Sequence, residues 1–263
     1  RFMEPYMPNP RSLAIWTFPL LAGLIAGCSA PSDPNASTAT STAAQPQTQE
    51  YPQGDPEFGD TLIWRESAEP AMMHPYLALT DGTGKFISSF VVETLLTVDN
   101  ETLEFEPWLA KDWEISEDHL SYTFYLRDDV TFSDGTPMTA ADVKFTWDSI
   151  ANPENDTAPV RSYLSDVTEC EVVDDYTVVF HVSKPYFGHE LSLGLFDIIP
   201  KHIYGVGDYN TNPAARAPVG TGPYKFEKWI TGQQVSLVRN ENYWNRDVEP
   251  PYLDKWIFRF IYD

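Results

Sequence analysis

Positive charge is scarce in this chain of 263 residues. Lysine and arginine together number 17, against 39 aspartate and glutamate residues, and the formal net charge is −22 at pH 7. A nucleic-acid-binding protein needs a positive surface to neutralise phosphates, so this balance argues against that class. The excess of carboxylates instead favours a protein that stays soluble in an exposed compartment.

Cysteine is nearly absent too, with only two residues, Cys28 and Cys170. Cys28 follows a largely apolar run over residues 13–25, which is preceded by the basic residue Arg11. Such a run is shorter than the roughly twenty apolar residues of a spanning helix, and it is typical of a secretory signal. Because Cys28 belongs to the end of that signal segment, Cys170 is the only cysteine left for the folded part, which excludes an intramolecular disulfide, and we expect a small buried thiol there.

Motifs of enzymes and metal sites are missing from the sequence. It has no His-Glu-x-x-His pair for zinc and no Gly-x-Ser-x-Gly elbow, and the Gly82–Lys85 stretch lacks two residues of a phosphate loop. The paired carboxylates at 128–129 and 174–175 lie in turn-like settings, whereas catalytic carboxylates need opposed positions across a substrate. We therefore expect no catalytic residue, no metal site and no cofactor, and predict that the protein is not an enzyme.

Residues 29–49 are almost entirely Ser, Thr, Ala, Pro, Gln and Asn, without an aromatic residue. Such a composition buries too little apolar surface to offset the entropy of ordering. We predict a disordered tether over residues 29–59, with order beginning near Asp60 and a first strand at 61–64.

The segment 110–150 has the most specific residue order. Tyr122, Phe124 and Leu126 alternate with more polar positions, which predicts a half-buried strand, and residues 133–135 supply a turn.

A helix should follow the turn. Thr139 and Asp142 have the spacing of a capping box, and Val143, Trp147 and Ile150 share one helical face. A further helix is predicted over 85–96, and further strands over 176–182, 224–230, 234–239 and 256–261. Strands interrupted by a few helices predict a mixed α/β (α+β) body.

Several segments recur in the order found in one protein family. The matching segments are 113–118, 122–127, 129–143, 174–178, 183–187, 199–203, 218–224 and 240–244. With them, the chain from about Thr61 to its last residue resembles the oligopeptide/dipeptide-binding family (family 5) of bacterial extracellular solute-binding proteins, which serve ABC importers.

The resemblance implies a two-lobed periplasmic-binding-protein-like fold with an extra inserted domain. Residues 60–94 plus 201–263 would form an incomplete ligand-binding lobe I, and residues 95–200 the inserted domain. Family members are longer, so the resemblance implies that the C-terminal lobe is missing from this chain.

Residues 24–28, Leu-Ile-Ala-Gly-Cys, resemble the lipobox of bacterial lipoproteins. This implies that residues 1–28 are a signal peptide with its lipobox, and that lipidation at Cys28 anchors the protein outside the cytoplasmic membrane. In a Gram-negative cell that location is the periplasm. An ordinary cleavage site that contains a cysteine is the alternative.

The ligand-binding residues implied by the resemblance are Asp81, Gly82, Thr83 and Gly84, whose backbone would pair with an extended peptide. An ordinary Gly-rich loop is the alternative interpretation. A ligand-touching tyrosine of the family is replaced here by Val160, which leaves room for a different ligand preference.

The function implied is that of a substrate-binding lipoprotein which captures di- or oligopeptides and delivers them to the permease of an ABC transporter. We expect a monomer that does not bind nucleic acid. The alternatives are another solute, such as an oligosaccharide, a nickel complex or glutathione, and, less favoured, a tethered secreted hydrolase or a structural surface lipoprotein.

Overall fold

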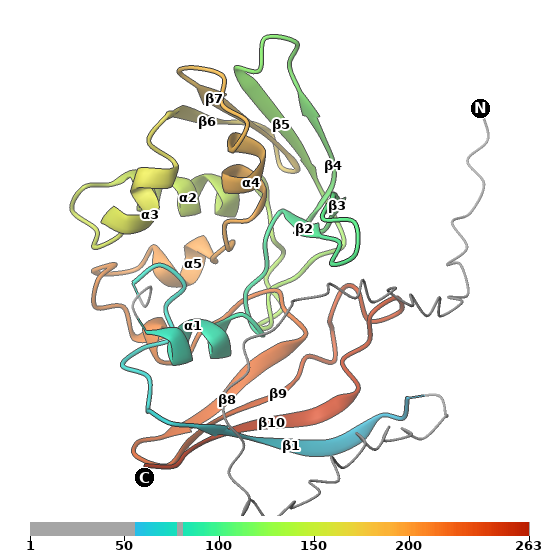
Figure 1. Ribbon diagram of the computed structural model, residues 1–263, viewed down its shortest axis with the longest axis vertical. Coiled ribbons are helices and arrows are strands. Elements are labelled where there is room, and N and C mark those ends of the chain that lie inside the picture. Colours follow the sequence, from blue (N-terminus) through green and yellow to red (C-terminus); the bar gives the residue numbers. More distant parts are fainter. Residues whose placement is uncertain (1–55, 78–80, 263) are drawn as a thin grey trace, which may run out of the picture. The chain divides into compact units, whose positions relative to one another are not determined.

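The computed structural model describes residues 56–77 and 81–262, and its elements are mixed in type, as predicted (Figure 1). The strands are β1 (Gly59–Glu66), β2 (Leu96–Val98), β3 (Phe105–Pro107), β4 (Ala110–Ile115), β5 (Ser121–Leu126), β6 (Val167–Asp174), β7 (Thr177–Val182), β8 (Tyr224–Ile230), β9 (Gln234–Arg239) and β10 (Leu253–Phe260). The helices are α1 (Gly82–Ser88), α2 (Ala140–Ala151), α3 (Ala158–Tyr163), α4 (His189–Gly194), α5 (Lys201–Tyr204) and a 3-10 turn, Pro213–Ala215. The predicted lipidation residue Cys28 lies outside the described residues.

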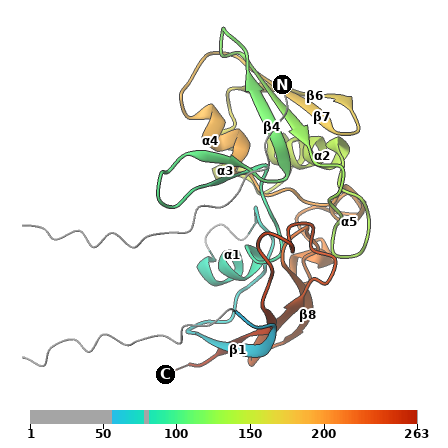
Figure 2. The same cartoon turned by 90° about the vertical axis from the view of Figure 1, so that its right-hand side faces the viewer.

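One four-stranded sheet has the order β1-β10-β9-β8. Strand β1 pairs in parallel with β10, in a register that places Ile63 opposite Ile257. The β10–β9 and β9–β8 pairs are antiparallel. Helix α1 lies on the face of this sheet that is turned toward the rest of the described body (Figures 1 and 2). Ile87 of α1 is fully buried there in a cluster with Leu237 and Phe258.

The second four-stranded sheet is antiparallel, with the order β4-β5-β7-β6. The predicted alternation is confirmed, because Tyr122, Phe124 and Leu126 are buried while their neighbours on β5 are partly exposed. Phe180 of β7 meets Phe124 edge to face at 5.9 Å. Cys170 of β6 is buried as expected, and burial raises the pKa of its thiol to about 12.

Helix α2 begins where the capping box predicts. Thr139 is its N-cap, and the Asp142 carboxylate accepts the backbone N–H of Thr139 at 2.9 Å. The other oxygen of Asp142 accepts the N–H of Lys201 at 2.9 Å, so one side chain also fixes the start of α5. Val143 and Ile150 are buried on the predicted face.

The helix predicted over residues 85–96 is wrong in extent, because α1 runs only from Gly82 to Ser88. Beyond it, the carbonyl of Phe90 accepts the N–H of Tyr224 at 3.1 Å, and that of Val91 accepts the N–H of Gly222 at 2.8 Å. These tertiary bonds use the carbonyls that a continuing helix would need for its own i→i−4 bonds. The segment therefore leaves the helix and runs beside 222–224.

Glu93 lies where four segments of the chain meet, and its side chain is almost fully buried. Each carboxylate oxygen accepts two hydrogen bonds of 2.7–2.9 Å. The donors are the Trp108 and Trp244 indoles and the Thr221 and Tyr243 hydroxyls. Burial raises the pKa of Glu93, and the four hydrogen bonds oppose that rise. This Glu93 junction accounts for two of the sequence motifs, 218–224 and 240–244, because each supplies donors to the same carboxylate.

Within the described ranges, no helix combines the length and apolar character needed to cross a membrane.

Candidate functional site

The loop predicted at residues 81–84 is instead the N-cap and first turn of α1, and Asp81 closes it. For brevity we keep the name Asp81–Gly84 loop for these four residues. Asp81 is the N-cap of α1, and its Oδ1 accepts the N–H of Gly84 at 2.9 Å. Its Oδ2 accepts the N–H of Ala71 at 2.6 Å. The carboxylate of Asp81 thus holds the loop against the preceding segment and stabilises the start of the helix.

The two glycines of this loop have different surroundings. A Cβ on Gly84 would lie 2.0 Å from the carbonyl oxygen of Met72, so this position needs glycine for the close approach of two backbones. A Cβ on Gly82 would have no atom within 4 Å. Gly82 is therefore the glycine whose backbone another molecule can approach.

Gly82 and Thr83 line a hollow between α1 and the end of β1, which we call the α1–β1 hollow. Its volume is about 600 Å³, and its other lining residues are Trp64, Arg65, Glu66, Ser67 and Phe86. Trp64 and Phe86 contact each other with ring centroids 5.8 Å apart, yet Trp64 remains 44% exposed. Large aromatic surface is thus available beside the predicted loop.

Strand β1 forms an edge of its sheet. Among residues 56–77 and 81–262, β10 is the only strand that pairs with β1, so β1 is an edge strand of the described sheet. Such an edge is a template for an additional strand. Because the strand ends at Glu66, in the wall of the α1–β1 hollow, edge and hollow form one continuous surface.

A second pocket lies on the other side of α1, and we call it the α1–α3–α4 pocket. Its volume is about 280 Å³. Lys85 of α1 contributes to it, and the Lys85 ammonium pairs there with the carboxylate of Asp197. The Tyr76 hydroxyl donates to the backbone carbonyl of the same aspartate. We use the term α1 site for the Asp81–Gly84 loop together with this pocket and the α1–β1 hollow.

His74 anchors the segment that enters the loop. It is fully buried, and its Nδ1 accepts the N–H groups of Tyr76 and Leu77 at 3.1 and 3.3 Å. The rings of Tyr204 and Tyr209 meet the imidazole edge-on at 5.0 and 4.9 Å. Burial, with a smaller contribution from the Lys85 charge, lowers the pKa of His74 to about 3, so it is neutral and structural.

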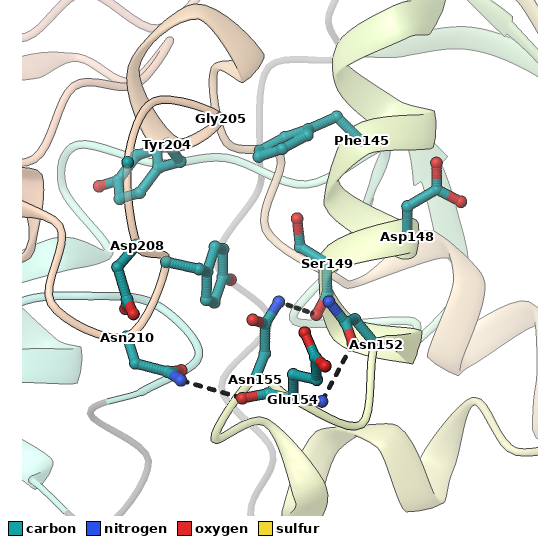
Figure 3. A pocket seen from close by; sticks show the side chains of 12 residues that line it. Phe145, Asp148, Ser149, Asn152, Glu154, Asn155, Tyr204, Gly205, Asp208 and Asn210 are labelled. Carbon is teal, nitrogen blue, oxygen red and sulfur yellow. Dashed lines mark hydrogen bonds between the residues drawn. The ribbon is translucent and has the colours of Figure 1, made fainter.

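A polar pocket of about 400 Å³ lies between the end of α2 and residues 204–210 (Figure 3). Its amides are engaged in fixing loops: Asn155 donates to the Ser149 carbonyl at 2.8 Å, and Asn210 donates to the Glu154 carbonyl at 3.0 Å. It shares no lining residue with the two hollows beside α1. We assign this pocket a structural role in holding the two loops together.

The acidic pairs singled out in the sequence are part of turns. Asp129 accepts two bonds of 2.9 Å from the Arg127 guanidinium, and Asp174 accepts the N–H of Tyr176 at 2.8 Å. In the part of the chain that the structure describes, no group of three or more His, Cys, Asp or Glu residues is placed to hold a metal ion.

The ligand-binding role of residues 81–84 stays a prediction, and the sequence did not indicate most of the residues that surround them. Lys85 adjoins the predicted residues, yet Asp197 lies 112 residues away and carried no signal of its own. The aromatic wall was also missed, although Trp64 belonged to the predicted first strand.

Comparisons with known proteins agree with this architecture. The family model described as "Bacterial extracellular solute-binding proteins, family 5 Middle" matches residues 104–263. The chain is 35% identical over 208 residues to Protein XP55 of Streptomyces lividans, covering 78% of this chain and 37% of that protein.

Two solved structures resemble the fold. One is NikZ from Campylobacter jejuni in complex with Ni(L-His), with a TM-score of 0.68 and 31% identity over 76% of this chain and 39% of that one. The other is the oligopeptide-binding protein AppA from Bacillus subtilis in complex with a nonapeptide, with a TM-score of 0.68 and 27% identity over 79% and 41%. The chain thus spans about two fifths of the length of these relatives. The family match and the shared fold together show that the chain belongs to the bacterial extracellular solute-binding proteins of family 5.

Proposed function

We propose that this chain is part of a solute-binding lipoprotein that captures di- or oligopeptides outside the cytoplasmic membrane and delivers them to the permease of an ABC importer. The observation that carries the proposal is the surface made by β1, an edge strand of the described sheet, by the aromatic wall of Trp64 and Phe86, and by the accessible backbone of Gly82. An extended peptide needs just such a combination of backbone groups and apolar contacts.

The proposed roles differ within the loop. Gly82 and Thr83 would present their backbone to the peptide, since both line the α1–β1 hollow. Asp81 and Gly84 would keep the loop in shape, since their contacts are with Ala71 and Met72.

The domain division predicted from the sequence is proposed here as well, with residues 60–94 plus 201–263 as lobe I and 95–200 as the inserted domain. It is supported by the sheet that β1 shares with β8–β10 and by the separate sheet that β4–β7 form. Peptide binding would stabilise closure of an opposing lobe over the α1 site, and the closed form would be delivered to the permease. We also propose that the protein is a monomer anchored through lipid on Cys28.

Native mass spectrometry of the protein isolated from its host membrane tests these proposals together. We expect a monomer whose mass includes lipid at Cys28 and a bound peptide. Thermal shift with peptide libraries then tests binding directly. The absence of both a bound mass and a thermal shift at saturating peptide would overturn the peptide assignment.

A non-peptide solute is the second candidate. It is favoured by the complex of NikZ with Ni(L-His), since that protein is 31% identical to this chain. The same mass spectra would then show a bound metal complex or another small molecule, and the peptide libraries would produce no shift.

A further inference from the structure

A hollow of about 440 Å³ lies between the turn that joins β4 to β5 and the segment that leads into α4, and we call it the β4–α4 hollow. Three of its lining side chains are aromatic: Tyr122, Tyr186 and Phe187. Among the described residues, Glu190 is its only acidic lining residue and His119 its only basic one. The hollow shares no lining residue with the α1 site, so an occupant here goes beyond the proposed function.

The aromatic side chains of this hollow leave much of their surface uncovered. Phe187 is 92% exposed and Tyr186 is 50% exposed, and their ring centroids lie 4.6 Å apart. Large apolar side chains that gather at one hollow, in contrast to single scattered ones, indicate a binding site. The two rings therefore offer aromatic surface to another molecule.

The aromatic wall is held in place by its own segment. A Cβ on Gly188 would collide with the ring of Tyr186, so the ring packs against a backbone that needs glycine. Tyr186 also meets the His189 ring edge-on at 5.4 Å. His189 is buried, and its Nε2 donates to the Lys184 carbonyl at 3.1 Å. These contacts order the wall without a ligand.

Glu190 supplies a negative charge beside the rings. Its Oε1 accepts the Trp113 indole N–H at 2.8 Å, which fixes the position of the carboxylate. In the described part of the chain, Glu190 forms no ion pair; Lys184, the nearest lysine or arginine in sequence, pairs with Asp166 at 3.2 Å. Burial, with a smaller contribution from the Glu190 charge, raises the pKa of Tyr122, so this tyrosine stays neutral. The carboxylate is thus available to a cation from outside.

The wider surroundings of the hollow carry the same sign of charge. Residues 95–200 contain 22 aspartates and glutamates but only five lysines and arginines, whereas the rest of the described chain contains twelve and ten. A surface dominated by one sign raises the local concentration of molecules of the opposite sign. Cations are therefore attracted to this part of the protein, and anions are repelled.

We propose that the β4–α4 hollow binds a compact organic cation, an ammonium group carried on aliphatic carbon, against the rings of Tyr186 and Phe187 and the carboxylate of Glu190. Aromatic rings attract such cations through the negative potential of their faces. The carboxylate adds a direct ionic attraction. A metal ion would find a single carboxylate in this hollow, which is too few ligands for a site.

Ligand-observed NMR titration of the whole protein compares cations with neutral molecules of similar shape. Choline is paired with dimethylbutanol, in which carbon replaces the nitrogen, and N-acetyl-lysine methylamide is paired with its norleucine counterpart, which lacks the ammonium group. The two pairs distinguish a free quaternary ammonium ion from the lysine side chain of a polypeptide. We expect the cation to bind at least about ten-fold more tightly than its neutral partner in at least one pair.

Two variants link this preference to the hollow. Glu190→Gln removes the charge but keeps an acceptor oxygen for Trp113, and Phe187→Ala removes a ring at a highly exposed position that folding tolerates. Each should weaken binding of the preferred cation at least about three-fold. The matched controls Glu241→Gln and Phe58→Ala change an exposed glutamate and a 63% exposed phenylalanine outside the hollow, and should leave the affinity unchanged.

Each outcome decides for or against the proposal. A preference for choline alone identifies a quaternary ammonium ligand, and a preference for the lysine derivative alone identifies a lysine side chain; either supports a cation site. Equal affinity of the cation and its neutral partner in both pairs would overturn the proposal. So would a preference for the cation that Glu190→Gln and Phe187→Ala both leave unchanged.

Discussion

At the Glu93 junction each carboxylate oxygen receives two hydrogen bonds inside the protein, whereas at the α1 site the large side chains Trp64, Tyr163 and Leu191 remain exposed within the described part of the chain. Both lie within the same short stretch of chain, since α1 ends only five residues before Glu93. This difference is the one expected between a contact that supports the fold and the proposed binding surface. A buried polar group must be fully satisfied to be stable, but a binding surface has to keep its contacts available.

The largest effect is expected for Glu93→Ala, which removes the acceptor at the centre of the Glu93 junction. It leaves four buried donors without their acceptor, and we expect the free energy of unfolding to fall by about 4 kcal/mol. Urea unfolding followed by tryptophan fluorescence measures the loss. Glu117→Ala, at an exposed glutamate, is the control and should change stability little. A loss below about 1 kcal/mol for Glu93→Ala would contradict the junction's supporting role.

The two loop glycines offer a matched pair. Gly84→Ala forces a Cβ against the Met72 carbonyl, and we expect a loss of about 2–3 kcal/mol in stability. Gly82→Ala meets no atom and should change stability by less than about 0.5 kcal/mol. Peptide affinity should instead weaken for Gly82→Ala, because its Cβ obstructs the approach of a ligand backbone. Equal stability losses for the two variants would remove the distinction between them.

Asp81→Asn and Asp81→Ala test how much the Asp81 carboxylate contributes to the stability of the fold at the edge of the proposed site. We expect a loss of about 1 kcal/mol for alanine, because the cap of α1 and the bond to Ala71 are both removed. Asparagine retains one acceptor oxygen and should lose less. Thermal unfolding of the two variants measures the order. If the asparagine variant were as destabilised as the alanine variant, the negative charge of Asp81, and not its capping oxygen, would account for the stabilisation.

The smallest effect concerns Arg127 at the rim of the junction, whose guanidinium lies 4.5 Å from the Trp244 ring centroid. The hydrogen bonds of Arg127 hold the pKa of Asp129 below its usual value of 3.8. A depressed carboxyl pKa stabilises the fold above pH 3.8, and that stabilisation is lost as the pH falls through the folded-state pKa.

Asp129→Asn should therefore cost about 0.5 kcal/mol at pH 7, a small value because the pair is solvent-exposed. The difference from the parent protein should disappear in acid. Unfolding temperatures from pH 7 down to pH 3 test this, with Asp128→Asn as the neighbouring control. A difference in unfolding temperature between Asp129→Asn and the parent protein that grew in acid would contradict the predicted direction of the pH dependence.

The sequence predicted those features that depend on neighbours along the chain. The alternation at Tyr122, Phe124 and Leu126 and the capping box at Thr139 are local patterns, and the structure confirms both. The helix over 85–96 was wrong because Tyr224 and Gly222 take the carbonyls of Phe90 and Val91. No local pattern reports such distant competitors.

In the candidate site, too, the sequence shows features of neighbouring residues and does not show those that depend on distant contacts. The two glycines are visible in the sequence, but their position in the first turn of α1 and the burial of Gly84 are not. The α1–α3–α4 pocket is not visible, because it needs α3, α4 and the Lys85–Asp197 pair to meet in space. The distinct surroundings of Gly82 and Gly84 also depend on where Met72 lies.

The parallel pairing of β1 with β10 has a consequence for biogenesis. The strands Gly59–Glu66 and Leu253–Phe260 are separated by nearly the whole described chain, so their sheet depends on contacts of high sequence separation. During synthesis β1 meets β10, the strand that pairs with it in the described part of the chain, only after residue 260, whereas the β4–β7 sheet is complete at Val182. The β1–β10 ladder therefore closes late, when nearly all of the described residues have been made.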